Sequence, residues 1–157
     1  VAVYDEAAAD FAARFGRSLP AVDAWGVDDA EVVLVMTGSF ATKAREAVER
    51  MRQLGERVGL VRPRLLRPFP EVALRRLLCG RPAVAVIDQN LSIGKGGILH
   101  AEIASALYGQ AGAPPVLASY VGGLGGRDIS AAELFAIVRE TRAAAERGAA
   151  PAPRLLF

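Results

Sequence analysis

The segment "PAVAVIDQNLSIGKGGILHAEIASALYG" (Pro82–Gly109) joins an apolar run to a helical pattern through a glycine-rich turn. "PAVAVID" (Pro82–Asp88) predicts a buried strand, and Leu99 and Ile103 recur at helical spacing beyond the glycines. "GKGG" (Gly94–Gly97) therefore lies at the junction of a strand and a helix. At such a junction, glycines serve either to hold a phosphate or only to let the chain turn.

The rest of the chain repeats this alternation of apolar runs and amphipathic stretches, which is typical of an α/β sandwich. "EVVLVMTG" (Glu31–Gly38) is continuous and β-branched, as expected for a strand that is covered on both faces. The predicted strands are residues 19–25, 31–38, 57–61, 82–88 and 114–123. The predicted helices are residues 4–16, 40–51, 70–80, 99–107 and 131–147.

Four residues define expected element ends. Ser39 is placed to cap the helix that follows it, and Ser130 is placed to cap the last helix. Pro70 is expected at the first helical position. Pro63 lacks the N–H that a strand ladder needs, so its strand either ends there or lies at the sheet edge.

The composition of the 157-residue chain, 52% hydrophobic and 23% charged, indicates a single folded domain with a proline-broken tail at residues 150–157. The net charge is +2 and the cations are interspersed with acids, so we expect no nucleic-acid partner. The most basic spot, Arg62, Arg64 and Arg67, is interpreted as a solvated or interface edge. No apolar run approaches the roughly 20 residues of a membrane helix, and no signal peptide is visible, so we expect a cytoplasmic protein without membrane contact.

Cysteine and histidine are too scarce for several kinds of site. Cys79 is the only cysteine, which excludes an intrachain disulfide and a multi-cysteine metal or iron–sulfur site and suits a reducing compartment. His100 is the only histidine, so we expect no metal site. The chain begins at Val1 rather than Met, and we expect a processed product or a piece of something longer.

Neither nucleotide-binding motif is complete in the first glycine loop. The dinucleotide motif G-x-G-x-x-G has Leu99 in place of its third glycine, and the P-loop motif has Gly96 where Ser or Thr should follow Lys95. Two interpretations stay open: a weak anion site at the helix N-terminus, or a sharp turn that Gly96 and Gly97 permit. In the second loop, "GGLGGRD" (Gly122–Asp128), the final Arg-Asp pair either clamps a ligand or partner or forms intrachain salt bridges.

No complete catalytic site can be assembled from the sequence. Cys79 ends an amphipathic helix and is interpreted as a small core residue, and His100 has no Ser or Asp neighbour that suggests a triad. Asp88 and Asn90 lie at a strand's carboxyl end, which is the ligand-binding edge of open α/β sheets, but they are also natural turn and helix-start residues. We therefore expect no catalytic residue in this chain.

Four segments together resemble the transketolase C-terminal-like domain (core domain II) of the alpha chain of pyruvate and 2-oxoacid:ferredoxin (flavodoxin) oxidoreductases. They occur in the family's order and are "VLVMTGSFATKAREAV" (Val33–Val48), "VGLVRPRLLRPFP" (Val58–Pro70), "AVIDQNLSIGKGGILHAEIASALY" (Ala85–Tyr108) and "YVGGLGGRDIS" (Tyr120–Ser130). The resemblance implies a three-layer α/β/α sandwich around a five-stranded, mainly parallel sheet with one antiparallel strand.

The resemblance also implies a parent enzyme that decarboxylates a 2-oxoacid on thiamine diphosphate with Mg²⁺. Such an enzyme passes electrons through [4Fe–4S] clusters to ferredoxin or flavodoxin and forms an acyl-CoA. "GLGGRDI" (Gly123–Ile129) favours pyruvate as the substrate. We expect no cofactor in this chain and a dimer of the assembled complex.

Within such an enzyme, this chain is expected to be a non-catalytic docking domain that packs against the catalytic domains or subunits and is inactive in isolation. The alternatives are a module whose glycine loops bind CoA or another anion, and an independent small enzyme. The interface or anion-binding candidates are Arg67, Phe69, Asp88, Asn90, Gly94, Gly96, Gly97, Gly125, Gly126, Arg127 and Asp128.

Overall fold

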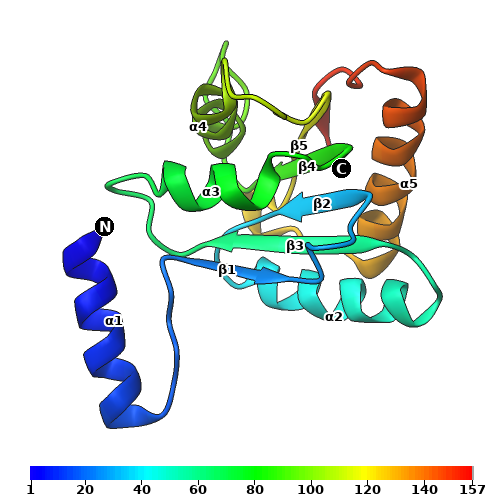
Figure 1. Cartoon of the computed structure of the whole chain (residues 1–157). Helices are drawn as coiled ribbons and strands as arrows, with labels where there is room; N and C mark the ends of the chain where they lie inside the picture. The colour runs from blue at the N-terminus through cyan, green and yellow to red at the C-terminus, as the bar shows by residue number, and fades with distance from the viewer. Residues whose placement is uncertain (157) are drawn as a thin grey trace.

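The computed structural model describes residues 1–156, and it shows an α/β sandwich (Figure 1). The strands are β1 (Val22–Trp25), β2 (Val32–Val35), β3 (Val58–Pro63), β4 (Ala83–Asp88), β5 (Val116–Val121) and β6 (Arg154–Leu155). The α-helices are α1 (Ala2–Phe15), α2 (Phe40–Gln53), α3 (Glu71–Leu78), α4 (Ile98–Leu107) and α5 (Ala131–Arg147), and a short 3₁₀ turn, η1 (Leu124–Gly126), precedes α5.

The six strands form one sheet in the order β1-β3-β2-β4-β5-β6. Within residues 1–156, only β1 runs antiparallel to its neighbour, with Trp25 opposite Leu60 of β3. The mainly parallel sheet with one antiparallel strand is therefore confirmed. The expected count of five strands is wrong, because residues 1–156 already form six.

The sixth strand comes from the tail at residues 150–157, which we expected only to be broken by prolines. Leu155 pairs with Val121 of β5, and the Leu156 N–H donates to the Val121 carbonyl oxygen at 2.8 Å. The Leu156 side chain is 8% exposed and lies against Gly122 and Ile129. The apolar end of the tail is visible in its own residues, but the free edge of β5 that pairs with it is not.

Helices cover both faces of the sheet, and β2 shows how its sequence is divided between them. Val32 and Leu34 belong to the core beneath α2 and α5, whereas Val33 and Val35 belong to the core beneath α3 and α4. All four side chains are fully buried. Burying such a side chain contributes about 1.5–3 kcal/mol, so this continuous apolar run commits the chain to a sheet with two covered faces.

Two expected element ends differ from the structure, and one alternative for a third is excluded. Ser39 is the N-cap residue of α2, but its side chain makes no capping hydrogen bond because its backbone already has helical angles. Pro70 is the N-cap of α3 rather than its first helical residue. Pro63 does end β3, but β3 lies inside the sheet between β1 and β2, so the edge-strand alternative is wrong. Pro63 lies beyond the pairing with β2 and faces only Val22 of β1.

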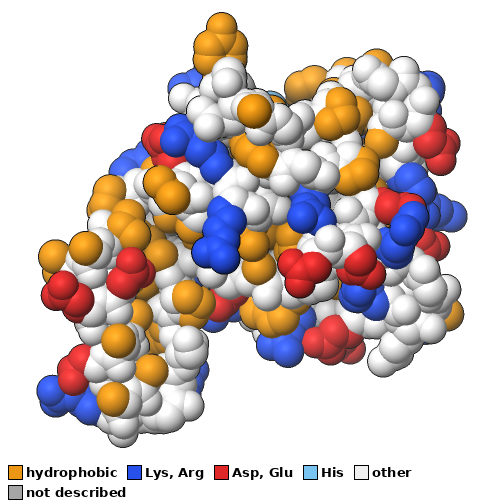
Figure 2. Space-filling model, viewed as in Figure 1, with side chains coloured by type: hydrophobic (Ala, Val, Ile, Leu, Met, Phe, Trp, Pro, Cys, Tyr) orange, Lys and Arg blue, Asp and Glu red, His pale blue; other side chains and the backbone are white. Residues whose placement is uncertain are grey.

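Helix α1 lies apart from the sandwich, at the lower left of Figure 1. It has no buried residue, and the Tyr4 hydroxyl donates to the Leu19 carbonyl oxygen at 3.1 Å. Hydrophobic side chains are visible along this helix in Figure 2. The Phe11 and Phe15 rings contact each other, with their centroids 4.7 Å apart. The core of the domain is therefore formed without α1.

The start of α5 follows the prediction for Ser130. The Glu133 N–H donates to the Ser130 hydroxyl oxygen at 3.2 Å, and the Ser130 N–H donates to the Glu133 carboxylate at 2.9 Å. This reciprocal pair is a capping box, which satisfies two backbone N–H groups that the helix itself leaves unpaired.

Replacing Glu133 with Gln should lower the free energy of unfolding by about 1 kcal/mol at neutral pH. The backbone N–H of Ser130, the guanidinium of Arg127 and the Ser130 hydroxyl hold the pKa of Glu133 at about 2, below its ordinary 4.5. Because the folded-state pKa is the lower one, the carboxylate stabilises the fold above pH 4.5, and this contribution is lost as the pH falls through about 2. Urea unfolding at several pH values should show the two proteins converging towards acid pH.

Glu46→Gln is the matched control, because Glu46 is an exposed side chain of α2 without an ion pair among residues 1–156. This substitution should change the free energy of unfolding by less than about 0.5 kcal/mol. A Glu133→Gln protein that is as stable as the wild type at neutral pH would contradict a stabilising role of the capping box.

Candidate functional site

The loops that follow the parallel strands meet at the carboxyl edge of the sheet. Strand order reverses between β2 and β4, and such a switch point is where open α/β sheets usually bind ligands. The Gln89 side-chain amide spans this point and donates to the Thr37 carbonyl oxygen at 2.9 Å. Gly123, after β5, lies against Phe40 and Gln89. The loops after β2, β4 and β5 therefore form one continuous surface.

The start of α4 is closed by two side chains of the same chain. The Asp88 carboxylate accepts hydrogen bonds from the Leu99 N–H at 2.7 Å and from the His100 N–H at 3.0 Å. The Asn90 side-chain oxygen accepts from the Ile98 N–H at 3.1 Å. These three N–H groups are the ones that a phosphate would use at this helix end. Asp88 and Asn90 occupy them, as helix-start residues do.

Asp88 is only 1% exposed, which makes it unusual for a carboxylate. Burial raises the pKa of Asp88 above its ordinary value, and the hydrogen bonds from the Leu99 and His100 N–H groups act in the opposite direction. The carboxylate is thus held by backbone donors and the positive end of the α4 dipole.

The glycines of the first loop are explained by this contact and by a tight turn. A Cβ atom on Gly97 would lie 2.0 Å from a carboxylate oxygen of Asp88, so only glycine fits beside it. Gly94 and Gly96 have φ angles of 78° and 86°, in the left-handed region. The Ser92 and Gly96 backbones exchange hydrogen bonds of 2.9 and 3.0 Å across the turn. The sharp-turn interpretation of "GKGG" therefore agrees with the structure.

A cleft of 290 Å³ lies beside this helix start. It brings together three predicted residues, Arg67, Phe69 and Asn90, from two different loops. The Arg67 guanidinium forms a 2.8 Å salt bridge with Glu102 of α4. The remaining lining residues are Thr37, Leu66, Ile98 and Leu99. Because the charged and amide groups already have partners within the chain, the cleft is best suited to an apolar group.

The second loop is held by ion pairs to two helices, as the salt-bridge interpretation predicted. Arg127 donates to Glu133 of α5 at 2.8 Å, and Lys43 of α2 contacts the Asp128 carboxylate. The hydrogen bond from Lys43 lowers the pKa of Asp128. Gly125 and Gly126 have positive φ angles of 63° and 82°, as the turn requires. Neither Arg127 nor Asp128 lines the cleft beside Arg67.

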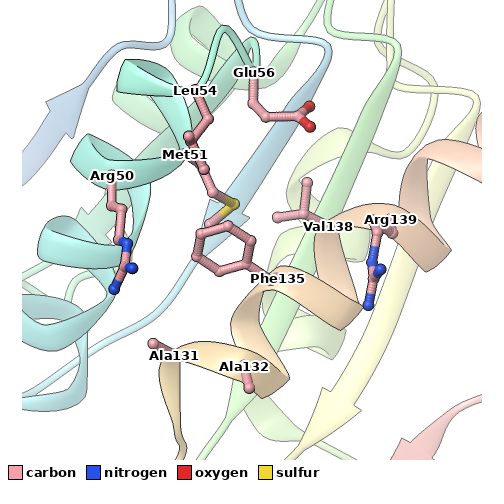
Figure 3. Close-up of a pocket in the computed structure, with 9 residues that line it drawn as sticks. All are labelled: Arg50, Met51, Leu54, Glu56, Ala131, Ala132, Phe135, Val138 and Arg139. Atoms are coloured by element: carbon pink, nitrogen blue, oxygen red, sulfur yellow. The ribbon is translucent and has the colours of Figure 1, made fainter.

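Sequence reasoning missed a second concave surface, a groove of 590 Å³ between α2 and α5 (Figure 3). Met51 and Phe135 face each other in it, and Arg50 and Arg139 lie on opposite sides. Met51 and Phe135 both lie in predicted helices, at residues 40–51 and 131–147, but nothing in the sequence indicated that their side chains would line one groove. The groove has no acid–base pair suited to catalysis, because its one carboxylate, Glu56, is paired with Arg142 at 2.5 Å.

The remaining candidates for chemistry have structural roles. The His100 ring nitrogen lies 3.4 Å from the Leu117 carbonyl oxygen, and Cys79 packs against the core beneath α3 and α4. Among residues 1–156, no three His, Cys, Asp or Glu side chains gather as metal ligands would. None of the helices in the described range is long and apolar enough to cross a membrane.

Residues 30–134 match the family described as pyruvate:ferredoxin oxidoreductase core domain II. The chain is 37% identical over 140 residues to the ketoisovalerate oxidoreductase subunit VorA of Pyrococcus abyssi, covering 88% of this chain and 35% of that protein. It is 41% identical over 127 residues to the pyruvate synthase subunit PorA of Thermotoga maritima, covering 81% of this chain and 32% of that protein. The chain thus spans about a third of the length of these relatives.

Solved structures show the same fold. A 2-oxoglutarate:ferredoxin oxidoreductase from Magnetococcus marinus, with 2-oxoglutarate, coenzyme A and succinyl-CoA bound, superposes with a TM-score of 0.60 at 20% identity, covering 85% of this chain and 21% of that one. A split-gene transketolase, an inactive beta4 tetramer, superposes with a TM-score of 0.55 at 20% identity, covering 74% of this chain and 39% of that one. The transketolase C-terminal-like fold is confirmed.

Replacing Asp88 with Ala should lower the free energy of unfolding by about 1–3 kcal/mol, because the Leu99 and His100 N–H groups would lose their acceptor. Urea unfolding at neutral pH measures the change. Asp28→Ala is the control, since Asp28 is exposed and its carboxylate makes no ion pair within residues 1–156. Equal losses for the two variants would show that the Asp88 contact does not fix the start of α4.

Proposed function

Since the chain belongs to the pyruvate:ferredoxin oxidoreductase core domain II family, we propose that it is a docking domain without catalytic residues of its own. Its carboxyl-edge surface packs against the catalytic domains or subunits of a 2-oxoacid:ferredoxin oxidoreductase. This surface consists of the loops at residues 67–69, 88–97 and 122–128. A single domain spanning the whole chain, with its tail returned to the sheet, is part of the same proposal.

The observation that carries this proposal is the closed start of α4. At the ligand-binding edge of the sheet, the N–H groups of Ile98, Leu99 and His100 donate to Asn90 and Asp88. The neighbouring cleft has apolar walls and internally paired polar groups. A surface that is rigid, partly apolar and without available catalytic groups suits protein contact better than chemistry.

The same observation weighs against a CoA-binding module. A phosphate at the first glycine loop would have to displace the Asp88 carboxylate, which is buried and hydrogen-bonded. Calorimetry of the chain with CoA should therefore detect no binding. Binding that is lost on Gly96→Asp and Gly125→Asp would favour the CoA module instead.

The parent enzyme is proposed to decarboxylate a 2-oxoacid on thiamine diphosphate with Mg²⁺ and to use [4Fe–4S] clusters, CoA and ferredoxin or flavodoxin. The [4Fe–4S] clusters and the metal ion do not fit the described residues, since the chain has one cysteine and no cluster of three metal-ligating side chains within residues 1–156. They would belong to other parts of a longer, dimeric assembly in the cytoplasm. Pyruvate as substrate stays a prediction, because ketoisovalerate and pyruvate enzymes both provide close relatives.

The variants Arg127→Glu and Phe69→Ala should each weaken assembly of the oxidoreductase about tenfold or more, because both lie on the proposed surface. Sedimentation of the full-length enzyme with its remaining subunits measures assembly. Arg147→Glu is the control for charge reversal, since Arg147 is exposed at the far end of α5. Unchanged assembly for both test variants would contradict the docking function.

A further inference from the structure

We propose that Ile93 is an apolar anchor of the docking surface, and that it inserts into an apolar pocket edged by carboxylates on another domain or subunit. The inference rests on the proposed docking function and adds the contact residue and the chemistry of its partner. Ile93 lies at the tip of the turn at residues 91–97, between β4 and α4.

Packing within the domain does not explain why the Ile93 side chain is exposed. Its side chain is 98% exposed, more than any other large hydrophobic side chain described. Single exposed hydrophobic residues are common, but Leu91 and Ile98 at the base of the same turn are also exposed, at 47% and 44%. In Figure 2, the loop between β4 and α4 projects at the top of the view with a hydrophobic side chain at its tip.

The turn holds Ile93 in a fixed position. Ser92 and Gly96 exchange backbone hydrogen bonds just below the tip. Asp88 and Asn90 fix the base of the turn to the start of α4. A residue held in this way loses little conformational entropy on binding, which is the property of an effective anchor. A turn required only to begin α4 would have no need of a large apolar residue at its tip.

The charges around Ile93 indicate what kind of partner surface fits it. The Lys95 ammonium, two residues beyond Ile93 in the same turn, is exposed and forms no ion pair or hydrogen bond with any residue from 1 to 156. The nearby acids are already engaged, because Asp88 is buried and Glu102 is paired with Arg67. The tip of the turn therefore carries the uncompensated positive charge of Lys95, which a carboxylate beside the partner's pocket would complement.

A second copy of this surface does not fit. In a symmetric contact through Ile93, each Lys95 would approach its counterpart, and like charges across an interface are unfavourable. The contact also continues beyond the anchor, because Ile98 belongs to the base of the turn and to the cleft of Phe69. The partner is thus a different surface, which covers both the anchor and the cleft.

Ile93→Asp in the full-length enzyme should raise the dissociation constant of the assembly by about thirtyfold or more, whereas Ile93→Val should change it by less than about threefold. Lys95→Glu should weaken assembly at low salt, with an effect that shrinks at high salt. Tyr108→Asp is the matched control, because Tyr108 is 87% exposed and follows the opposite end of α4. Analytical ultracentrifugation measures all four variants.

The results separate this inference from the docking function. If Arg127→Glu and Phe69→Ala weaken assembly but Ile93→Asp does not, the anchor role of Ile93 is contradicted and the docking function of the surface is supported. If none of the three weakens assembly, both are wrong.

A photoreactive p-benzoylphenylalanine at position 93 provides a second measurement that does not depend on the stability of the aspartate variant. In the assembled enzyme, it should crosslink to another domain or subunit, in a segment that contains Asp or Glu. Crosslinks confined to residues of this domain, or to a partner segment without acidic residues, would overturn the inference.

Discussion

The carboxylate of Asp88 joins the end of β4 to the start of α4, and the shape of the carboxyl edge depends on that contact. It accepts hydrogen bonds from two backbone N–H groups and is almost completely buried. One of its oxygens lies 2.0 Å from the position that a Cβ atom of residue 97 would take. A buried carboxylate is tolerated only where donors compensate for its lost hydration, and here the helix supplies both the donors and a favourable dipole. Both ends of the turn at residues 91–97 are therefore held at the start of α4, and the residues between them project from the surface.

This constraint changes what the glycine-rich loop means for function. In a nucleotide-binding protein, glycines before a helix leave its N–H groups available for phosphate. In this chain the same backbone geometry is present, but Asp88 and Asn90 take the place of the ligand. The loop after β5 is likewise restrained, by the pairs Arg127–Glu133 and Lys43–Asp128. Rigid loops with internally satisfied groups, beside an apolar cleft, are consistent with a surface for protein contact in a chain that spans about a third of the length of its relatives.

Local sequence patterns predicted the structure correctly where neighbouring residues determine it. The two-faced burial of β2 and β4 followed from continuous apolar runs, and the N-cap role of Ser130 followed from a Ser at the start of a periodic stretch. Two other local patterns did not decide the outcome. Pro63 left open a strand end or an edge position, and the structure shows that β3 ends at Pro63 while pairing with β1 places the strand inside the sheet. Ser39 stands at the right position without capping, because its own backbone is already helical.

By itself, the sequence determined the α/β class, the helices, the family resemblance and the absence of enough cysteine or histidine for a cluster, because these properties reside in periodicity, local motifs and residue counts. Only the tertiary structure decided that the tail becomes a sixth strand, that Arg67, Phe69 and Asn90 line one cleft, and that Asp88 closes the start of α4. Each of these depends on which groups become neighbours after folding. The spacing of the residues does not show that a hydrogen-bond acceptor lies eleven residues before its donor. Nor does it show that one edge of the sheet is free to pair with another strand.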